Sequence, residues 1–167
     1  MSPWKRTFFD RAGFLADSDL LRRPRVFVRQ TEKALRLPVG LVRRVARAVL
    51  REHDCPHGVN VIFTGDARIR RLNRRYRGRA RVTDVLAFPI REPGDSDEVP
   101  LGEIYVNVER AVRVAPENGT TPRTEALLYV VHGLLHLLGF DDGDAAERRR
   151  MWAEQKRLMA DLGHPLP

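Results

Sequence analysis

One segment, from Ala126 to Leu138, carries apolar side chains on nearly every face of the helix that it would form. A helix that is apolar all round is buried inside a domain. Thr121 suits the N-cap of this helix, Pro122 its first residue and Gly139 its end. The apolar stretch is shorter than the roughly 20 residues that a membrane span needs. We therefore expect a buried central helix and no transmembrane helix.

Short strands and amphipathic helices are predicted to alternate along the rest of the chain. Apolar runs predict strands at residues 25–30, 59–64, 85–90 and 101–108. Helical spacing predicts one helix that begins near residue 38 and others at about 67–75, 109–115 and 145–162. Pro89 has no backbone N–H, so its strand should lie at an edge of the sheet or end there. We expect Tyr76 and Trp152 to lie on the buried sides of their helices.

Length and composition bound the organisation of the chain. Its 167 residues fit one domain, which we place at 21–167, and the mixed composition of an N-terminal extension at 1–20 leaves partial disorder of that extension open. Hydrophobic residues make up 43% and charged residues 31%, as is typical of globular proteins. The N-terminus lacks the continuous apolar centre of a signal peptide, and the single Cys55 cannot form an internal disulfide. We therefore expect a cytoplasmic protein.

Positive charge is concentrated in one segment. The formal net charge is +8, and eight arginines lie between residues 68 and 81. Arginine binds phosphate through paired hydrogen bonds and releases counterions, so a dense arginine run favours nucleic-acid binding. A solvated basic helix face is the alternative. The predicted contacts to nucleic acid are Arg68, Arg71, Arg74, Arg75, Arg77, Arg79 and Arg81.

Two histidines interrupt the apolar helix. His132 and His136 are four residues apart, so their side chains lie on one face. Two imidazoles at this spacing can share one zinc ion, whereas the alternative is a pair of hydrogen-bonded core histidines. We expect a third ligand from the acidic turn after the helix. Asp142 is the first choice, and Asp141, Asp144 and a merely capping or calcium-like turn stay open.

Three ordered blocks of the sequence form one pattern. They are His132-Gly-Leu-Leu-His136-Leu-Leu-Gly-Phe-Asp-Asp142, the pair Leu72–Arg77 and Thr83–Pro89, and Leu101-Gly102-Glu103-Ile104. This pattern resembles the signature of the YbeY family, zinc-dependent bacterial endoribonucleases of ribosomal RNA maturation. The resemblance covers about residues 25–160 and departs from the family pattern where Asp142 stands in place of a third histidine.

The resemblance implies an α+β fold, in which a small mixed four-stranded sheet packs against helices and the metal site lies at the end of the buried central helix. It implies one zinc ion per chain at His132, His136 and Asp142, and catalytic roles for Arg77 and His132. A guanidinium can clamp a phosphate, and zinc polarises a phosphoryl oxygen. It also implies ribosomal RNA as substrate, the ribosome or its small subunit as partner, and a role in ribosome quality control.

Asp142 changes the charge of the expected site. Zinc with two histidines and one aspartate has one net positive charge where three neutral histidines leave two, so it should be a weaker Lewis acid. Oxygen donors favour harder ions, which leaves manganese or iron open. Because of the altered ligand, a second function also stays open: a ribosome-associated RNA-binding factor with a structural or weakened metal site. A fourth protein ligand would close such a site, and the other histidines are His53, His57 and His164.

A zincin-like metalloprotease is a further alternative, because zincins also carry paired histidines on a helix. They use His-Glu-x-x-His, with the glutamate as general base. Gly133 stands at that position here, so Glu103 or Glu125 would have to replace the glutamate in space.

Overall fold

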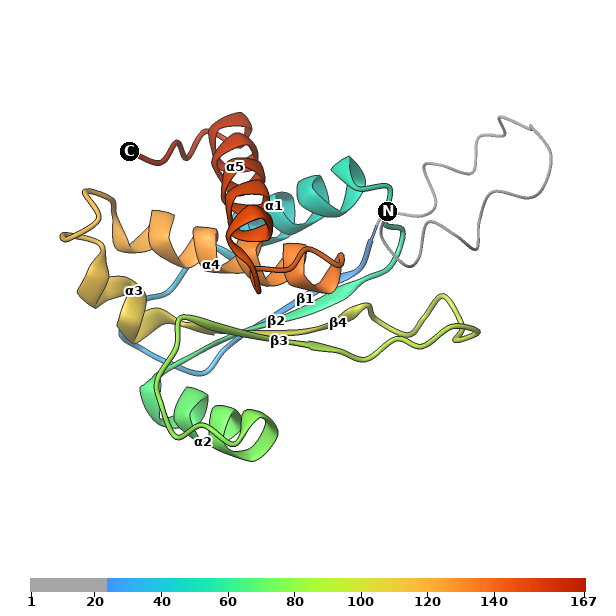
Figure 1. Ribbon diagram of the computed structural model, residues 1–167, viewed down its shortest axis with the longest axis horizontal. Helices are drawn as coiled ribbons and strands as arrows, with labels where there is room; N and C mark the ends of the chain where they lie inside the picture. Colours follow the sequence, from blue (N-terminus) through green and yellow to red (C-terminus); the bar gives the residue numbers. More distant parts are fainter. Residues whose placement is uncertain (1–23) are drawn as a thin grey trace.

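A computed structural model describes residues 24–167 (Figure 1), and the expected N-terminal extension at 1–20 lies outside the described residues. The strands are β1 (Val26–Gln30), β2 (Val59–Thr64), β3 (Val85–Pro89) and β4 (Gly102–Asn107). The helices are α1 (Val39–Glu52), α2 (Asp66–Arg77), α3 (Val108–Val114), α4 (Pro122–Leu137) and α5 (Ala145–Asp161). Each of these elements was expected from the sequence, with boundaries that differ by a few residues.

The strands form one mixed sheet in the order β1-β2-β4-β3. β1, β2 and β4 are parallel, and β3 runs antiparallel to β4 at the edge. The edge position of β3 confirms the prediction from Pro89, which is its last residue. Parallel neighbours need a crossover, and α1 supplies it between β1 and β2. The expected α+β fold with a mixed four-stranded sheet is confirmed.

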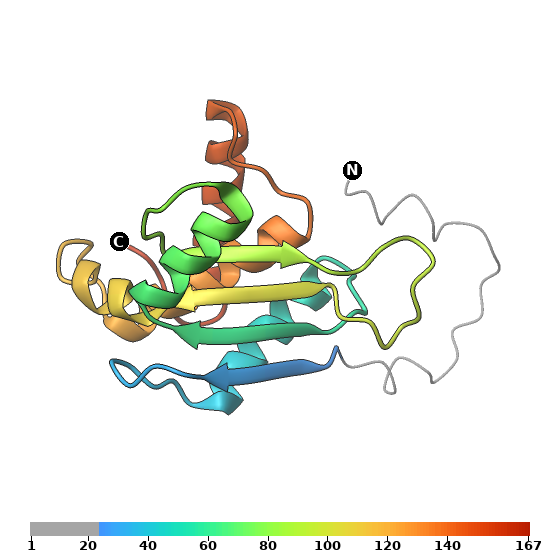
Figure 2. The same ribbon diagram turned by 90° about the horizontal axis from the view of Figure 1, so that it is seen from below.

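The helices divide unequally between the two faces of the sheet. α1, α4 and α5 lie on one side, and α2 lies on the other (Figures 1 and 2). The hydrophobic core fills the first side and includes Phe63 of β2, Ile104 of β4, and Leu127 and Leu134 of α4. The second side therefore has much less cover.

α4 is the buried central helix that the apolar segment predicts. The hydroxyl of Thr121 caps it by accepting a hydrogen bond from the backbone N–H of Thr124. Gly139, with a φ of 89°, lets the chain leave the helix. At Gly133 a Cβ atom would lie 2.6 Å from Cγ2 of Ile104, so the helix backbone packs directly on β4. This contact fixes the rotation of α4 about its axis, and therefore the direction in which its histidines point.

Two predictions of burial are wrong. Trp152 is 48% exposed, with the ammonium of Lys156 at 6.0 Å from its ring, and Tyr76 is 58% exposed at the end of α2. Helical periodicity locates a face, but it does not show whether another element covers that face along its whole length. None of the described helices is long and apolar enough to cross a membrane.

Candidate metal centre

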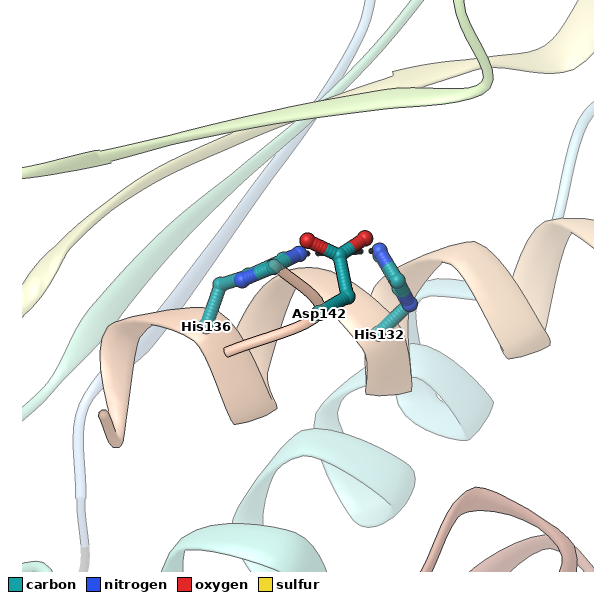
Figure 3. A group of neighbouring side chains, drawn as sticks. All are labelled: His132, His136 and Asp142. Atoms are coloured by element: carbon teal, nitrogen blue, oxygen red, sulfur yellow. Dashed lines mark hydrogen bonds between the residues drawn. The ribbon is translucent and has the colours of Figure 1, made fainter. Parts of the chain in front are cut away.

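Three side chains converge at the C-terminal half of α4 (Figure 3). His132 and His136 lie one turn apart with their ring centroids at 4.5 Å, and their Nε2 atoms are 3.0 Å from each other. The carboxylate of Asp142 comes back over the helix from the turn that follows it. One ligand atom from each of the three residues lies within 4.8 Å of the others. The structure thus brings together the two histidines and the first-choice aspartate.

The outer nitrogens of the two imidazoles are both held by oxygen acceptors. His136 Nδ1 lies 3.2 Å from the backbone carbonyl oxygen of Phe140, which can only accept, so Nδ1 carries the proton. His132 Nδ1 lies 3.2 Å from Oε1 of Gln155. The Gln155 amide nitrogen donates to the carbonyl of Met151, and this contact turns Oε1 toward His132. In its neutral form, each imidazole therefore presents a lone pair at Nε2.

These facing lone pairs are the observation that fits a cation. At 3.0 Å, two Nε2 atoms without a proton between them repel each other, and a shared metal ion removes that repulsion. Two nitrogens bound tetrahedrally to one zinc ion at 2.0–2.1 Å are about 3.3 Å apart, so small rotations of the rings suffice. Outer hydrogen bonds of this kind orient the histidine ligands in known metal sites.

Burial favours the neutral form that a metal ligand requires. Burial first, and then the neighbouring His136, lower the pKa of His132 below its ordinary value. Asp84, Gln155 and Asp142 act in the opposite direction and more weakly. His132 therefore keeps its Nε2 lone pair at neutral pH.

The turn after α4 explains why Asp142, rather than its neighbours, faces the histidines. Asp141 uses Oδ1 to accept hydrogen bonds from the backbone N–H groups of Asp142 and Gly143. Asp144 caps α5 in a capping box with Glu147. Arg148 fixes the turn by donating to the backbone carbonyls of Asp142 and Gly143, at 2.9 and 3.0 Å. The other two aspartates are thus occupied by the backbone.

A cavity of about 300 Å³ opens beside the site. Asp84, directly before β3, lies in its wall together with His132 and Asp142. Oδ1 of Asp84 accepts hydrogen bonds from the hydroxyl of Thr83 and the backbone N–H of Val85. The rest of the lining is Leu128, Tyr129, Arg148, Met151, Trp152 and Gln155. The cavity gives a ligand access to His132 and Asp142.

The predicted arginines lie on and after α2. Arg77 is the exposed last residue of α2 and is not among the residues that line the cavity. The guanidinium of Arg68 lies 5.2 Å from the ring centroid of Tyr105, and that of Arg75 lies 5.4 Å from the ring of Tyr76. The remaining predicted arginines are exposed, namely Arg71, Arg74, Arg79 and Arg81.

Neither glutamate proposed for a protease lies at the site. Glu125 is 2% exposed and accepts hydrogen bonds from Thr120 and Asn118. Glu103 accepts a hydrogen bond from the hydroxyl of Tyr105 on the face of the sheet away from α4. The protease alternative thus has no general base from either residue.

The other histidines do not complete the shell. His53 contacts the ring of Phe140 and lies 3.2 Å from Glu154, and His164 lines a separate cavity beside α1. His57 is buried elsewhere, and the metal-binding group found in the described chain has three members. A site with three protein ligands keeps a position open for water or substrate.

Sequence reasoning missed several residues around the site. Gln155 and Arg148 lie on α5 and reach the site only because α5 packs across α4. Asp84 lies in a recognised sequence block, but only the packing of β3 on α4 shows that it lines the cavity. The available signal was a polar glutamine within the buried stripe of an amphipathic helix.

Comparisons with known proteins identify one family. The family model described as Endoribonuclease YbeY matches residues 28–163. Proteins named Endoribonuclease YbeY are 39% identical over 117 residues in Synechocystis (65% of each chain) and 39% identical over 130 residues in Thermus thermophilus (75% of this chain and 94% of that one). A solution structure from Thermotoga maritima has a TM-score of 0.58 at 29% identity, over 82% of this chain and 88% of that one. The chain belongs to the YbeY endoribonuclease family.

Proposed function

We propose that this YbeY-family endoribonuclease binds one zinc ion through His132, His136 and Asp142 and cleaves ribosomal RNA during its maturation. The observation that supports the site best is the position of the two Nε2 atoms, which lie 3.0 Å apart with the carboxylate of Asp142 beside them. We further propose that the protein works in the cytoplasm, on the ribosome or its small subunit. Membership of the family, rather than the metal site, supports these partners.

A zinc ion held there would polarise a phosphoryl oxygen and supply a more acidic water than bulk solvent. The chain's own residues do the rest. Gln155 and the Phe140 carbonyl hold the imidazoles in the tautomer that directs both lone pairs inward. Arg148 holds the turn that presents Asp142.

A base and a phosphate clamp complete the proposal. Oδ1 of Asp84 is already engaged by two donors, so Oδ2 is the oxygen that would take a proton from the attacking hydroxyl or water in the cavity. Arg77 would bind a phosphate of the RNA, because its guanidinium is exposed on the arginine-rich helix. The other arginines of α2 and the following loop would hold the RNA backbone.

Metal analysis tests the site directly. Wild-type protein purified without added metal should contain about one zinc ion per chain, and His136→Ala and Asp142→Asn should lose it. Asp141→Asn is the matched control, because asparagine still accepts the two backbone hydrogen bonds and lies outside the group. Zinc retained by Asp142→Asn would contradict the assigned third ligand. Wild-type protein without metal would favour an RNA-binding factor instead.

Cleavage assays on ribosomal RNA test the reaction. Arg77→Ala and Asp84→Asn should keep zinc but lose activity, about 10²–10⁴-fold for the general base. RNA with a 2′-deoxy substitution at the cleaved position distinguishes two mechanisms. Loss of cleavage would show that the 2′-hydroxyl attacks the phosphate, and continued cleavage would show that water does. Full activity of Asp84→Asn would exclude it as the base.

A further inference from the structure

Within residues 24–167, the second face of the sheet has much less cover than the first. α2 is the one described helix on this side, where it packs on β3 and β4 and leaves β1 open (Figure 2), whereas in β2 only Asn60 is partly exposed. The strand register places a row of side chains across the open part. In sheet order the row is Phe27, Asn60, Glu103 and Phe88. We call this row, with Tyr76 and Tyr105 beside it, the open sheet face.

Aromatic rings lie at both ends of this row. Tyr76 of α2 packs 5.0 Å from Phe88, and Phe88 packs 5.9 Å from Tyr105 in an edge-on contact. Phe27 stands alone on β1, three strand spacings or about 14 Å from Phe88. Phe27 is 61% exposed and Tyr76 is 58% exposed. The row therefore has an exposed aromatic ring at each end, and each ring can stack on a flat group.

Arginines are interleaved with these rings. Arg68 lies over Tyr105 and Arg75 over Tyr76, both in cation–π geometry. Arg29 is exposed two residues after Phe27 and therefore points to the same side of β1. Aromatic platforms flanked by arginines suit a polyanion with flat rings, because the rings stack on the bases and the guanidinium groups neutralise phosphates.

Glu103 lies in the middle of the row. Its Oε2 accepts a hydrogen bond from the hydroxyl of Tyr105 at 2.8 Å, and Oε1 lies 3.4 Å from the amide nitrogen of Asn60. Burial, followed by this hydrogen bond to Glu103, raises the pKa of Tyr105, so its hydroxyl remains a donor. A fixed carboxylate repels phosphate but accepts hydrogen bonds from the amino groups of bases. Base edges therefore fit this position better than the RNA backbone does.

We propose that the open sheet face binds an unpaired segment of the RNA substrate, with bases stacked on Phe27 and on the Tyr76–Phe88 pair and a base amino group bound by Glu103. The proposal rests on the proposed function for the kind of polymer and adds the surface that binds it. β3 connects this face to the metal centre, because the strand carries Phe88 on one side and packs against α4 on the other. Asp84, directly before β3, lines the cavity beside the histidines. A strand on the open sheet face can thus pass over the β3 edge into the cavity.

RNA binding without cleavage tests this proposal. The full chain, kept in a chelator so that it cannot cut, is titrated against a fluorescent single-stranded RNA and against the same RNA as a duplex. Phe27→Ala and Tyr76→Ala should each weaken single-strand binding about 5- to 150-fold, whereas Phe27→Tyr and Tyr76→Phe should bind as wild type does. Val112→Ala is the control, since Val112 is an exposed apolar residue on α3. Duplex binding should be weaker and should not respond to these variants.

Base preference tests Glu103. Wild type should bind oligo-cytidine or oligo-adenosine more tightly than oligo-uridine, which has no exocyclic amine, and Glu103→Gln should reduce this preference. Single-strand binding that is unchanged in Phe27→Ala and Tyr76→Ala would overturn the proposal. A change in the oligomeric state of these variants on sedimentation, with no change in their affinity for RNA, would overturn it as well. Binding to this face without metal-dependent cleavage would uphold it and reject the nuclease assignment. Cleavage that is insensitive to both alanine variants would do the reverse.

Discussion

Replacing Gly133 with alanine tests how closely α4 packs on the sheet. The added Cβ would lie 2.6 Å from Cγ2 of Ile104 and 3.2 Å from Cγ2 of Val85. Carbon atoms in ordinary contact are about 3.5–4.0 Å apart, so the helix or β4 must shift by about 1 Å. Ile104 is fully buried and Val85 nearly so, and neither has free space to move into.

The expected cost combines two opposing terms. Overpacking of a well-filled core costs about 1–3 kcal/mol, whereas alanine in place of glycine within a helix contributes about 1 kcal/mol of stabilisation. Gly40 supplies the matched control, because it lies in the exposed first turn of α1 and its added Cβ would come no closer than 3.9 Å to Arg44. Gly40→Ala gains propensity without strain, so the difference between the two variants isolates the overpacking. At about 2–4 °C per kcal/mol for a chain of this size, Gly133→Ala should melt well below Gly40→Ala.

Urea unfolding of the metal-free chain measures both variants, and a double-mutant cycle identifies the contact. Ile104→Ala removes Cγ2 and alone should cost about 2–5 kcal/mol, but in combination with Gly133→Ala it should cost less than the sum. Equal stability of Gly133→Ala and Gly40→Ala, or strict additivity in the cycle, would refute the close packing. Zinc binding measured in parallel shows whether the shift of α4 also disturbs the histidines.

Three further predictions concern a contact at the site, an ion pair and a helix cap. Gln155→Leu removes the acceptor at His132 Nδ1 and should weaken zinc affinity about 10- to 100-fold in a chelator competition, whereas Gln155→Glu should not; equal affinities would contradict the tautomer assignment. The hydrogen bond from Arg113 lowers the pKa of Asp66, so its stabilisation is present above the unfolded-state pKa and is lost as pH falls through the folded-state pKa. The stability difference between wild type and Asp66→Asn should therefore be larger at about pH 7 than at about pH 3, and a difference independent of pH would contradict it. Thr121→Ala should destabilise the chain by about 1 kcal/mol in urea unfolding, because it removes the cap of α4, and Thr121→Ser should be as stable as wild type. Equal stability of all three proteins would contradict this role of the cap.

Sequence periodicity predicts the elements of this fold because one side of the sheet carries nearly all of the core. Alternation in β4 and the all-round apolar character of α4 both follow from burial against the same cluster. The error at Tyr76 has the same origin. α2 is the one described helix on the other face, and its C-terminal end carries Tyr76 over the edge strand β3, where the ring meets Phe88 but stays exposed.

The histidine pair could be predicted because its spacing is a property of one helix. The choice among Asp141, Asp142 and Asp144 could not, since it depends on which carboxylates accept backbone hydrogen bonds within the turn. Gln155 comes from a distant part of the chain, and only the packing of α5 on α4 brings it to the site. Contacts between elements of this kind leave no periodic signal in a sequence.

Gly133 connects the fold to the choice between functions. In a zincin, the residue after the first histidine is a glutamate that acts as base. Here even a methyl group at that position would overlap Ile104, so a glutamate would force α4 off the sheet. The close helix-to-sheet contact therefore excludes the zincin base from this helix. The proton acceptor that we propose, Asp84, comes from another element and lies in the cavity wall beside His132.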